Sequence, residues 1–268
     1  MKDSTAHNKQ IVDQFSKQSV PFTKVPGHLD SVNTLISMSG VKQTDFVLDV
    51  ACGPGIVTCE FAKLASKVIG MDVTPAMIDT AQKRQLEIGL QNISWELGDA
   101  LSLPFDEKTF DVVITRYSFH HLLSPKLALD EMIRVCKDGG VVLVADVAIP
   151  EKNSISYDKL ELLRDPSHTH ALTENEFDIL FQSSNLNDCR YTSYLVDIEL
   201  ESQLKASFPN PGDMDIVREL ITKDVSINEL GINSRIQADQ IWYSVPIRVY
   251  AGKKQLEVQS QHVSTLDA

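Results

Sequence analysis

The sequence lacks any long apolar run. Although 43% of its 268 residues are hydrophobic, no window reaches the roughly 18 consecutive apolar residues that a membrane-spanning helix needs. The first ten residues, MKDSTAHNKQ, are polar and lack the apolar core of a secretory signal. We therefore expect a cytoplasmic protein with no membrane partner.

Cysteine is scarce, and its spacing excludes the usual structural uses. Four cysteines without a CxxC pair argue against a zinc knuckle or a disulfide framework and fit a reducing compartment. A histidine metal site is also not expected. His120 and His121 are adjacent, whereas His168 and His170 fall on an expected loop, so none of them forms a spaced ligand set on a defined element.

Positive charge is in deficit. The chain has 25 Lys and Arg against 37 Asp and Glu, a formal net charge of −12. A surface that binds nucleic acid normally carries a basic stripe, and no basic patch is visible here. We therefore expect a small-molecule partner rather than nucleic acid. The sequence leaves a monomer and a homodimer equally open.

What is present is an alternation of apolar, β-branched runs with helical patterns up to residue 150. Nearly continuous apolar strands indicate burial on both faces, as in a parallel sheet. Repeated strand–helix–strand units specify a doubly wound α/β sheet, whose ligands bind beyond the carboxyl ends of the strands. The expected strands cover 45–51, 67–73, 93–100, 110–118 and 139–148, and the expected helices cover 56–65, 75–89 and 125–137.

The alternation of apolar strands and helical patterns ends after residue 150. Residues 171–186 are typical of a helix, with Thr173 and Glu176 as its capping box. Two further strands are expected over 189–200 and 241–252. The polar, helical segment between them, over about 201–239, is expected to form a lid.

The stretch LDVACGPGIVTCEFA (48–62) contains an acid, a small-residue turn and a helix start. A nicotinamide-dinucleotide fingerprint requires a third glycine where Thr58 stands, and no G-K-[ST] follows for a nucleotide P-loop. Asp49 comes before the turn, where a carboxylate would repel a pyrophosphate and attract a cationic amine. The loop therefore favours a positively charged ligand with an adenosine and disfavours an oxidoreductase.

Two further acids end the next two expected strands. Asp72 follows Asp49 by 23 residues, where a carboxylate can bind both ribose hydroxyls. Asp99 can accept a hydrogen bond from an adenine amine. Each acid alone is an ordinary strand-end or turn residue, but three acids at the ends of three successive strands form a specific pattern.

These ordered motifs resemble class I S-adenosylmethionine (SAM)-dependent methyltransferases, in the small-molecule branch that includes the ubiquinone/menaquinone-biosynthesis type. The motifs are D-x-A-x-G-x-G (49–55), GMDVTPAMIDTA, GDALSLPFDEKTFDVV, RYSFHHL and LDEMIRVCKDGGVVLVAD. The resemblance implies a seven-stranded, mostly parallel Rossmann-like sheet with an antiparallel last strand and a helical cap. It divides the chain into a lid segment (1–40), a SAM-binding core (41–150), the rest of the sheet with its cap (151–254) and a disordered tail (255–268).

The resemblance also implies the cofactor-binding residues. Asp49 and the backbone around Gly53 and Gly55 would hold the methionine part, with Arg116 near its carboxylate or the loop. Ala51 replaces the more usual first glycine.

The remaining implied contacts concern the adenosine and the lid. Val73 and Met77 would flank the adenine, although Met77 equally fits a core helix position. Asp72 would bind the ribose, and Asp99 with Ala100 would read the adenine edge. The segment QFSKQSVPFTKVPGH resembles the family's lid, which brings Gln18 and Phe22 to the cofactor; the family commonly has tyrosine in place of Phe22.

The candidate general base is the histidine pair His120–His121, just past the fourth expected strand. Asp146 ends the fifth strand, and neighbouring strand ends could bring its carboxylate to His120, fixing the tautomer of the imidazole. Some sugar O-methyltransferases of this class have a histidine and an aspartate at matching places. The alternative is that these residues are structural.

Several other side chains are candidates for the substrate pocket. Tyr117 and Phe119, together with Phe22 and the 151–239 cap, are expected to shape it. Arg164, Asp165 and His168 could line its mouth or form a salt bridge within the cap.

We therefore expect methyl transfer from SAM to a small organic molecule, at oxygen or carbon before nitrogen. The missing N/D-P-P-[YFW] tetrapeptide argues against methylation of amines on nucleic-acid bases. A second hypothesis stays open, namely that the protein binds SAM without transferring methyl, as a cyclase-like catalyst or a scaffold.

Overall fold

The computed structural model of the chain describes residues 4–19 and 31–256. Its centre is one sheet, built from β1 (Phe46–Val50), β2 (Lys67–Asp72), β3 (Ile93–Leu97), β4 (Phe110–Arg116), β5 (Cys136–Val147), β6 (Leu186–Glu199), β7 (Arg235–Gln237) and β8 (Gln240–Lys254). The strand order is β3-β2-β1-β4-β5-β8-β6. The first five strands are parallel, and β8 is antiparallel to both β5 and β6. The expected fold is confirmed, with short β7 as an unpredicted extra strand on β8.

The helices begin and end near the expected residues. Thr173 and Glu176 form the predicted capping box. The helix expected over 125–137 is shorter, because Cys136 pairs with Phe110 and opens a strand that includes Lys137. The helical elements are α1 (Ser4–Gln18), α2 (Val32–Ser39), α3 (Ile56–Ala62), α4 (Pro75–Ile88), η2 (Phe119–His121), α5 (Pro125–Val135), η3 (Glu151–Asn153), α6 (Ser154–Arg164), α7 (Glu174–Gln182), α8 (Leu200–Ala206) and α9 (Asp213–Ile227).

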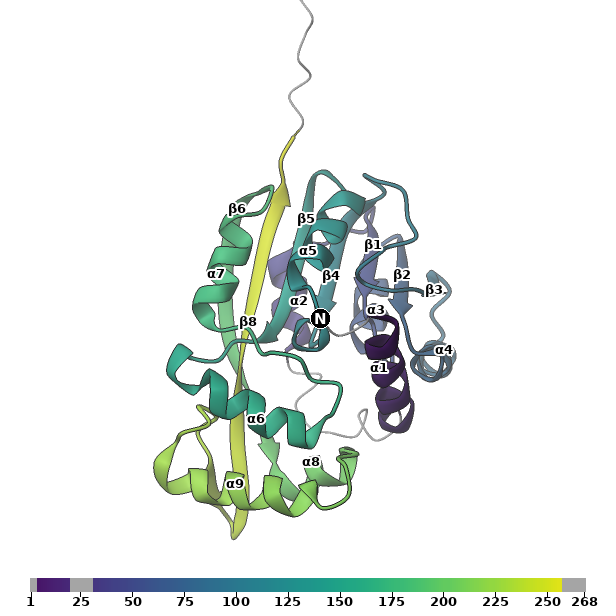
Figure 1. Cartoon of the computed structure of the whole chain (residues 1–268). Helices are drawn as coiled ribbons and strands as arrows, with labels where there is room; N and C mark the ends of the chain where they lie inside the picture. Colours follow the sequence, from purple (N-terminus) through teal and green to yellow (C-terminus); the bar gives the residue numbers. More distant parts are fainter. Residues whose placement is uncertain (1–3, 20–30, 257–268) are drawn as a thin grey trace, which may run out of the picture.

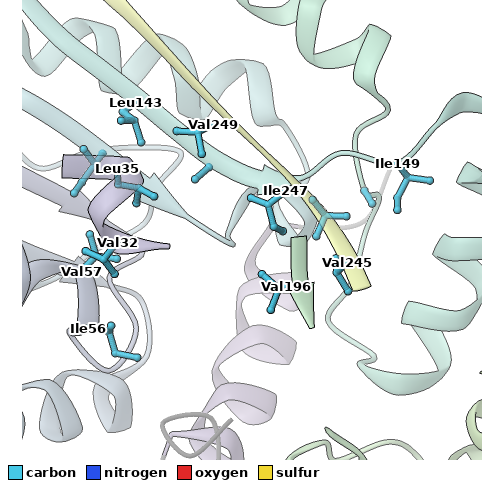
Figure 2. Close-up of a cluster of buried hydrophobic side chains, with 14 of the residues drawn as sticks. Val32, Leu35, Ile56, Val57, Leu143, Ile149, Val196, Val245, Ile247 and Val249 are labelled. Carbon is cyan, nitrogen blue, oxygen red and sulfur yellow. The ribbon is translucent and has the colours of Figure 1, made fainter. Parts of the chain in front are cut away.

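Each central strand is buried on both faces, and its alternate residues enter two different hydrophobic clusters. Val47 and Leu143 belong to the cluster that includes α2 and α3, whereas Leu48 and Val142 belong to the cluster that includes α5 and α7. This alternation follows from the two-residue repeat of a strand. Figure 2 shows part of the first cluster. Because both faces are covered, the strands read as continuous apolar runs, as the sequence indicated.

Helices α6, α8 and α9 gather around the lower part of β8 in Figure 1. α6 packs on α9, and α8 packs on β6, β8 and α9. The segment expected over 201–239 contains two helices, α8 and α9, and the chain between Ala206 and Asp213 separates them. Within the described part of the chain, no helix has the length and apolar character needed to cross a membrane.

Candidate active site

A cleft opens beyond the ends of β1, β2, β3 and β4 and is bordered by α1. This strand-end cleft contains about 940 Å³ of empty space, its open mouth included, which is within the range of small-molecule sites. Its lining includes Asn8, Ile11 and Phe15 of α1, which the sequence did not single out. Nine of the predicted cofactor residues also line it: Asp49, Ala51, Gly53, Asp72, Val73, Met77, Asp99, Ala100 and Arg116.

The turn after β1 adopts the left-handed backbone conformation at three positions. Ala51 and Gly53 both have φ of 53°, and Gly55 has φ of 75°. A Cβ added at Gly53 would meet nothing within 4 Å. A Cβ at Gly55 would lie 2.7 Å from Trp95 and 2.8 Å from Ala81, so this glycine permits close packing of the turn. Gly53 lines the cleft and Gly55 does not.

Asp49 is a buried carboxylate at the centre of the cleft. Thr58 Oγ1 donates a hydrogen bond to its Oδ2 at 2.6 Å. Burial raises the pKa of Asp49 to about 7, and the Thr58 bond and the charge of Arg116 offset only part of that rise. No ion pair to Asp49 is formed by the residues that the structure describes. A bound cation would therefore stabilise the carboxylate.

Asp72 and Asp99 are held differently from Asp49. Asp72 accepts hydrogen bonds from the backbone N–H groups of Gly53 and Thr74, both at 2.8 Å. Burial raises the pKa of Asp72 despite these bonds. Asp99 accepts a bond from Asn8 Nδ2 of α1 at 2.7 Å. The carboxylate that was predicted to bind the adenine edge therefore already accepts a hydrogen bond from the Asn8 amide of α1.

Two residues predicted for the ligand sites are placed differently by the structure, and a third cannot be located in it. Gln18 does not reach the strand-end cleft, because its Nε2 donates to Asp165 Oδ2 at 3.0 Å. Phe119 is buried in the cluster with α5 and α7, and so does not shape a pocket. Phe22 falls outside the described residues.

A second cavity, the cap pocket, adjoins the strand-end cleft. It contains about 830 Å³ of empty space, its mouth included. Phe15, Tyr117 and His121 line both cavities. One wall is aliphatic and comes from the ends of β5, β6 and β8, and the opposite wall is polar and comes from η2, α6 and Gln18. The aliphatic residues are Val147, Val196, Ile198, Val245 and Ile247.

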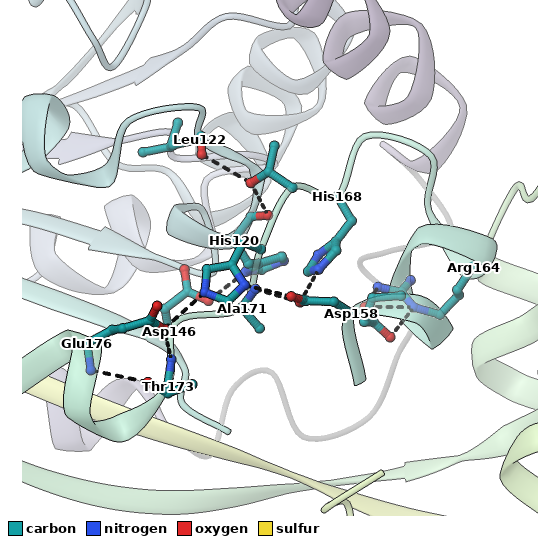
Figure 3. Close-up of polar contacts among 12 residues, drawn as sticks. His120, Leu122, Asp146, Asp158, Arg164, His168, Ala171, Thr173 and Glu176 are labelled. Carbon is teal, nitrogen blue, oxygen red and sulfur yellow. Dashed lines mark hydrogen bonds and ion pairs between the residues drawn. The ribbon is translucent and has the colours of Figure 1, made fainter. Parts of the chain in front are cut away.

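The structure brings His120 and Asp146 together at the cap pocket (Figure 3). His120 Nδ1 lies 2.6 Å from Asp146 Oδ1. The backbone N–H groups of Phe119 and Val147 also donate to this carboxylate. Burial alone would lower the pKa of His120, but the charge and hydrogen bond of Asp146 outweigh it and raise that pKa. The same pairing lowers the pKa of Asp146 against the effect of burial.

The loop that follows α6 holds the backbone of the histidine pair in place through hydrogen bonds. Thr169 donates to the His120 carbonyl through both its N–H and its hydroxyl, at 2.9 and 2.8 Å. Asp158 of α6 anchors the loop through His168 and His170, at 2.8 and 2.6 Å (Figure 3). The sequence left open whether His168 lines the pocket mouth or forms a salt bridge within the cap; it lines neither cavity and pairs with Asp158. Over residues 4–19 and 31–256, no group of three or more His, Cys, Asp or Glu is arranged to hold a metal ion.

A buried ion pair lies in the polar wall of the cap pocket. Arg164 Nε donates to Glu161 Oε1 at 2.9 Å, and Arg164 Nη1 contacts Ser207 Oγ at 3.4 Å. The sequence prediction included Arg164 and missed Glu161, Tyr157 and Tyr243. Tyr157, Glu161 and Arg164 recur at the spacing of one helix face, a signal that could have identified the wall.

The geometry of the strand-end cleft fits a SAM-like ligand. Gly53 leaves open space beside the turn. Asp49 offers a buried carboxylate that a cationic amine would stabilise. Each oxygen of Asp72 accepts one backbone bond and keeps acceptor capacity for a hydroxyl.

Comparison with known proteins agrees with this geometry. Residues 48–144 match the methyltransferase domain family. The chain is 28% identical over 212 residues to the uncharacterized methyltransferase YcgJ of Bacillus subtilis, an alignment that covers 78% of this chain and 83% of that protein. It is 33% identical over 146 residues to the demethylmenaquinone methyltransferase of Lactobacillus johnsonii, covering 48% of this chain and only 60% of that protein.

Solved structures extend the likeness to the whole fold. The crystal structure of Bacillus subtilis YcgJ matches with a TM-score of 0.77 at 26% identity, covering 85% of this chain and all of that one. A Haemonchus contortus phosphoethanolamine N-methyltransferase, solved with S-adenosylhomocysteine, matches with a TM-score of 0.64 at 16% identity, covering 87% of this chain and 54% of that one. At the latter identity the likeness is one of fold alone.

Proposed function

This chain belongs to the class I SAM-dependent methyltransferases, with SAM as its cofactor, and we propose that it methylates an oxygen or carbon atom of a small organic molecule held in the cap pocket. When bound, SAM supplies a methyl group whose bond to the cationic sulfur breaks as the bond to the acceptor forms. The name of the Lactobacillus johnsonii relative, a demethylmenaquinone methyltransferase, supports a small organic acceptor.

The predicted cofactor roles carry over as part of this proposal. Asp49 would pair with the amino group of SAM, and Arg116 would lie near its carboxylate. Asp72 would accept from the ribose hydroxyls, while Val73 and Met77 flank the adenine. Asp99 would read the adenine edge, which requires the amide of Asn8 to move or to share this carboxylate.

The observation that carries the proposal is the shared boundary of the two cavities. Phe15, Tyr117 and His121 line both, so an acceptor in the cap pocket can lie next to a cofactor in the strand-end cleft. Such alignment and the exclusion of water supply much of the acceleration of a displacement reaction. The α8 residues Gln203 and Ala206 also line the cap pocket, which supports the lid role proposed for the 201–239 segment.

We assign the general base to His120, with Asp146 as its positioning residue. A base is needed where the acceptor still holds its proton at working pH. Because Nδ1 bonds to Asp146, Nε2 is the ring nitrogen left to take that proton. The Asp146 carboxylate then stabilises the resulting imidazolium.

Four free cysteines support a reducing, cytoplasmic setting for this reaction. The net charge of −12 supports an acceptor other than nucleic acid.

The test begins with the full-length protein, methyl-labelled SAM and fractions of a small-molecule extract, followed by mass spectrometry of labelled products. The Asp146→Asn variant should then lower kcat for that product by roughly 100-fold, within the usual range for a general base. The acid limb of its pH profile should move to lower pH, because the carboxylate that raises the pKa of His120 is lost. Affinity for S-adenosylhomocysteine should not change.

Asp224→Asn is the matched control. Asp224 is equally buried and accepts bonds from Leu230 N and Ser234 Oγ, but it lines neither cavity. Wild-type kcat and pH profile in Asp146→Asn would refute the base assignment. Binding of S-adenosylhomocysteine without labelled product from any fraction would refute methyl transfer and favour the cyclase-like or scaffold hypothesis.

A further inference from the structure

The ring of His121 is held by a relay that ends on a buried carboxylate. Ser167 Oγ lies 3.1 Å from His121 Nδ1 and donates to Asp165 Oδ1 at 2.6 Å. A hydroxyl has one hydrogen, so Ser167 Oγ can only accept a hydrogen bond from His121. Nδ1 therefore carries the ring proton of His121.

Asp165 is fixed in its turn by groups on two segments. Its carboxylate accepts bonds from Ser167 N at 2.9 Å and from Gln18 Nε2 of α1 at 3.0 Å. Burial would raise the pKa of Asp165, but nearby positive charge and these hydrogen bonds outweigh burial and lower that pKa. Asp165 is thus an ionised acceptor at neutral pH, as the relay requires.

His121 stays neutral over the pH range in which His120 gains and loses its proton. Burial lowers the pKa of His121 to about 3, and the neighbouring His120 adds to this effect. The two ring centres are 4.2 Å apart, so a second positive charge there would be strongly disfavoured. With Nδ1 protonated, Nε2 of His121 is a permanent hydrogen-bond acceptor, and no residue in the described ranges occupies it.

His121 is one of the residues at the boundary between the two cavities. Of the three residues that line both, Phe15 has no polar side-chain atom and the Tyr117 hydroxyl lies 2.9 Å from that of Tyr194. His121 therefore supplies a ring-nitrogen acceptor at this boundary, and His120 lines the cap pocket beside it.

We propose that the methyl acceptor presents two hydrogen-bond donors on neighbouring atoms, the reacting O–H to His120 Nε2 and the second donor to His121 Nε2. This inference rests on the proposed function, since it places the acceptor in the cap pocket. One hydroxyl hydrogen cannot serve both nitrogens, so two acceptors side by side select a vicinal diol, a catechol or a similar pair. Ser167 and Asp165 are positioning residues, because they act through His121.

The proposal has a consequence for the reaction. As the methyl group arrives at the reacting oxygen, the O–H bond breaks and its proton moves to His120 Nε2. The methylated oxygen then has no hydrogen to donate, while the bond to His121 persists. The product loses one of two hydrogen bonds and binds more weakly than the substrate.

The test measures binding to the full chain saturated with S-adenosylhomocysteine, with catechol, its monomethyl ether guaiacol and its dimethyl ether veratrole as probes. A net hydrogen bond contributes about 1 kcal/mol, or roughly fivefold in Kd. We expect catechol to bind roughly fivefold more tightly than guaiacol, and guaiacol roughly fivefold more tightly than veratrole. His121→Phe should abolish only the first difference. Equal affinities for the three probes, or a wild-type pattern in His121→Phe, would overturn the proposal.

The relay is tested by nitrogen-15 NMR of the same complex, which distinguishes the two neutral tautomers. His121 should keep Nδ1 protonated and Nε2 bare from pH 5 to 9. Ser167→Ala should give a mixture of tautomers and weaken catechol, and Ser167→Thr should restore both. An Nε2-protonated His121 in the wild type would refute the relay. Because no readout requires turnover, its failure is distinguishable from failure of methyl transfer.

Discussion

The buried carboxylates of the strand-end cleft and of the cap pocket are held in opposite electrostatic states. In the cleft, burial raises the pKa of both Asp49 and Asp72. In the cap pocket burial acts in the same direction, but partner groups outweigh it and lower the pKa values of Asp146, Glu161 and Asp165. The two cavities share a boundary, yet the pKa of a buried carboxylate is raised in one and lowered in the other.

The difference lies in the origin of the counter-charge. Glu161 and Asp146 find theirs within the chain, on Arg164 and His120. Asp49 forms no ion pair with any residue the structure describes, and the charge of Arg116 offsets only part of the effect of burial, so a cationic ligand would supply the missing counter-charge. The cleft is therefore tuned to a cationic ligand, whereas the cap pocket has already paired its charges and offers hydrogen bonds to its own ligand.

The Asp72→Ala variant should have the largest effect, which is a loss of cofactor affinity in the strand-end cleft. Loss of the ribose contacts should weaken S-adenosylhomocysteine by about 3 kcal/mol, or roughly 100-fold in Kd, since hydrogen bonds to charged groups contribute about 1.5–3 kcal/mol each. Isothermal titration calorimetry measures the change. Asp111→Ala is the control, because Asp111 lies near the opposite end of β4 and binds Phe46 N and Lys137. Equal affinities in both variants would contradict the ribose role.

The pH dependence of cofactor binding sharpens the contrast. An ammonium group pairs only with ionised Asp49, whose pKa without ligand is about 7. Affinity for S-adenosylhomocysteine should therefore rise by about tenfold from pH 6 to pH 8, because a protonated carboxylate must first lose its proton. Calorimetry in buffers of different ionisation enthalpy should also detect the released proton. Asp49→Asn should bind weakly with a flat profile; a wild-type slope in that variant would assign the titration to another group.

A change in the cap should affect stability without affecting the cleft. His170 has its pKa raised to about 9, first by its hydrogen bond to Asp158 and also by Glu176. Its stabilisation is complete below its ordinary pKa of about 6.5 and is lost as pH rises through about 9. The side chain is 39% exposed, so screening reduces the expected contribution to about 1 kcal/mol.

The measurement is denaturant unfolding of the wild type and His170→Gln at pH 7 and pH 10. The difference in unfolding free energy between the two proteins should shrink at pH 10, with S-adenosylhomocysteine affinity at pH 7 unchanged. A constant difference would show that the charge of His170 does not contribute.

The smallest expected effect belongs to the turn of the cleft. Ala51 has φ of 53°, where a Cβ costs about 1–2 kcal/mol and glycine costs none. Glycine loses more entropy on folding, so Ala51→Gly should stabilise the fold by only about 0.5 kcal/mol. Ala128→Gly, inside α5, should instead destabilise it by at least about 1 kcal/mol. Thermal unfolding of both variants checks the opposite signs, and a loss in Ala51→Gly would contradict the strain at this position.

The strand-end cleft was predictable because its residues are local. In a parallel sheet every strand delivers its last residue to the same edge, so Asp49, Asp72 and Asp99 could be placed from strand patterns alone. His120 and Asp146 could be brought together by the same reasoning. The direction of a loop or lid side chain depends instead on what packs against it, which is why the bond of Gln18 to Asp165 at the cap pocket could not be predicted.

The cap pocket was only partly predictable from the sequence, for the same physical cause. Its walls combine α1, η2, α6, α8 and the ends of three strands. The sequence pattern of one segment does not indicate which distant residues will contact that segment. Phe119 illustrates the limit, since an aromatic next to the histidine pair turned into the core.

The sequence by itself determined the doubly wound sheet, the order of its acids and the class of cofactor, because strand periodicity and strand-end position are local properties of the chain. Only the tertiary structure decided which histidine stays neutral. That depends on burial of the His121 ring beside His120. Ser167 meets the same ring from a loop 46 residues further along the chain and fixes its tautomer, and only packing can supply such a contact.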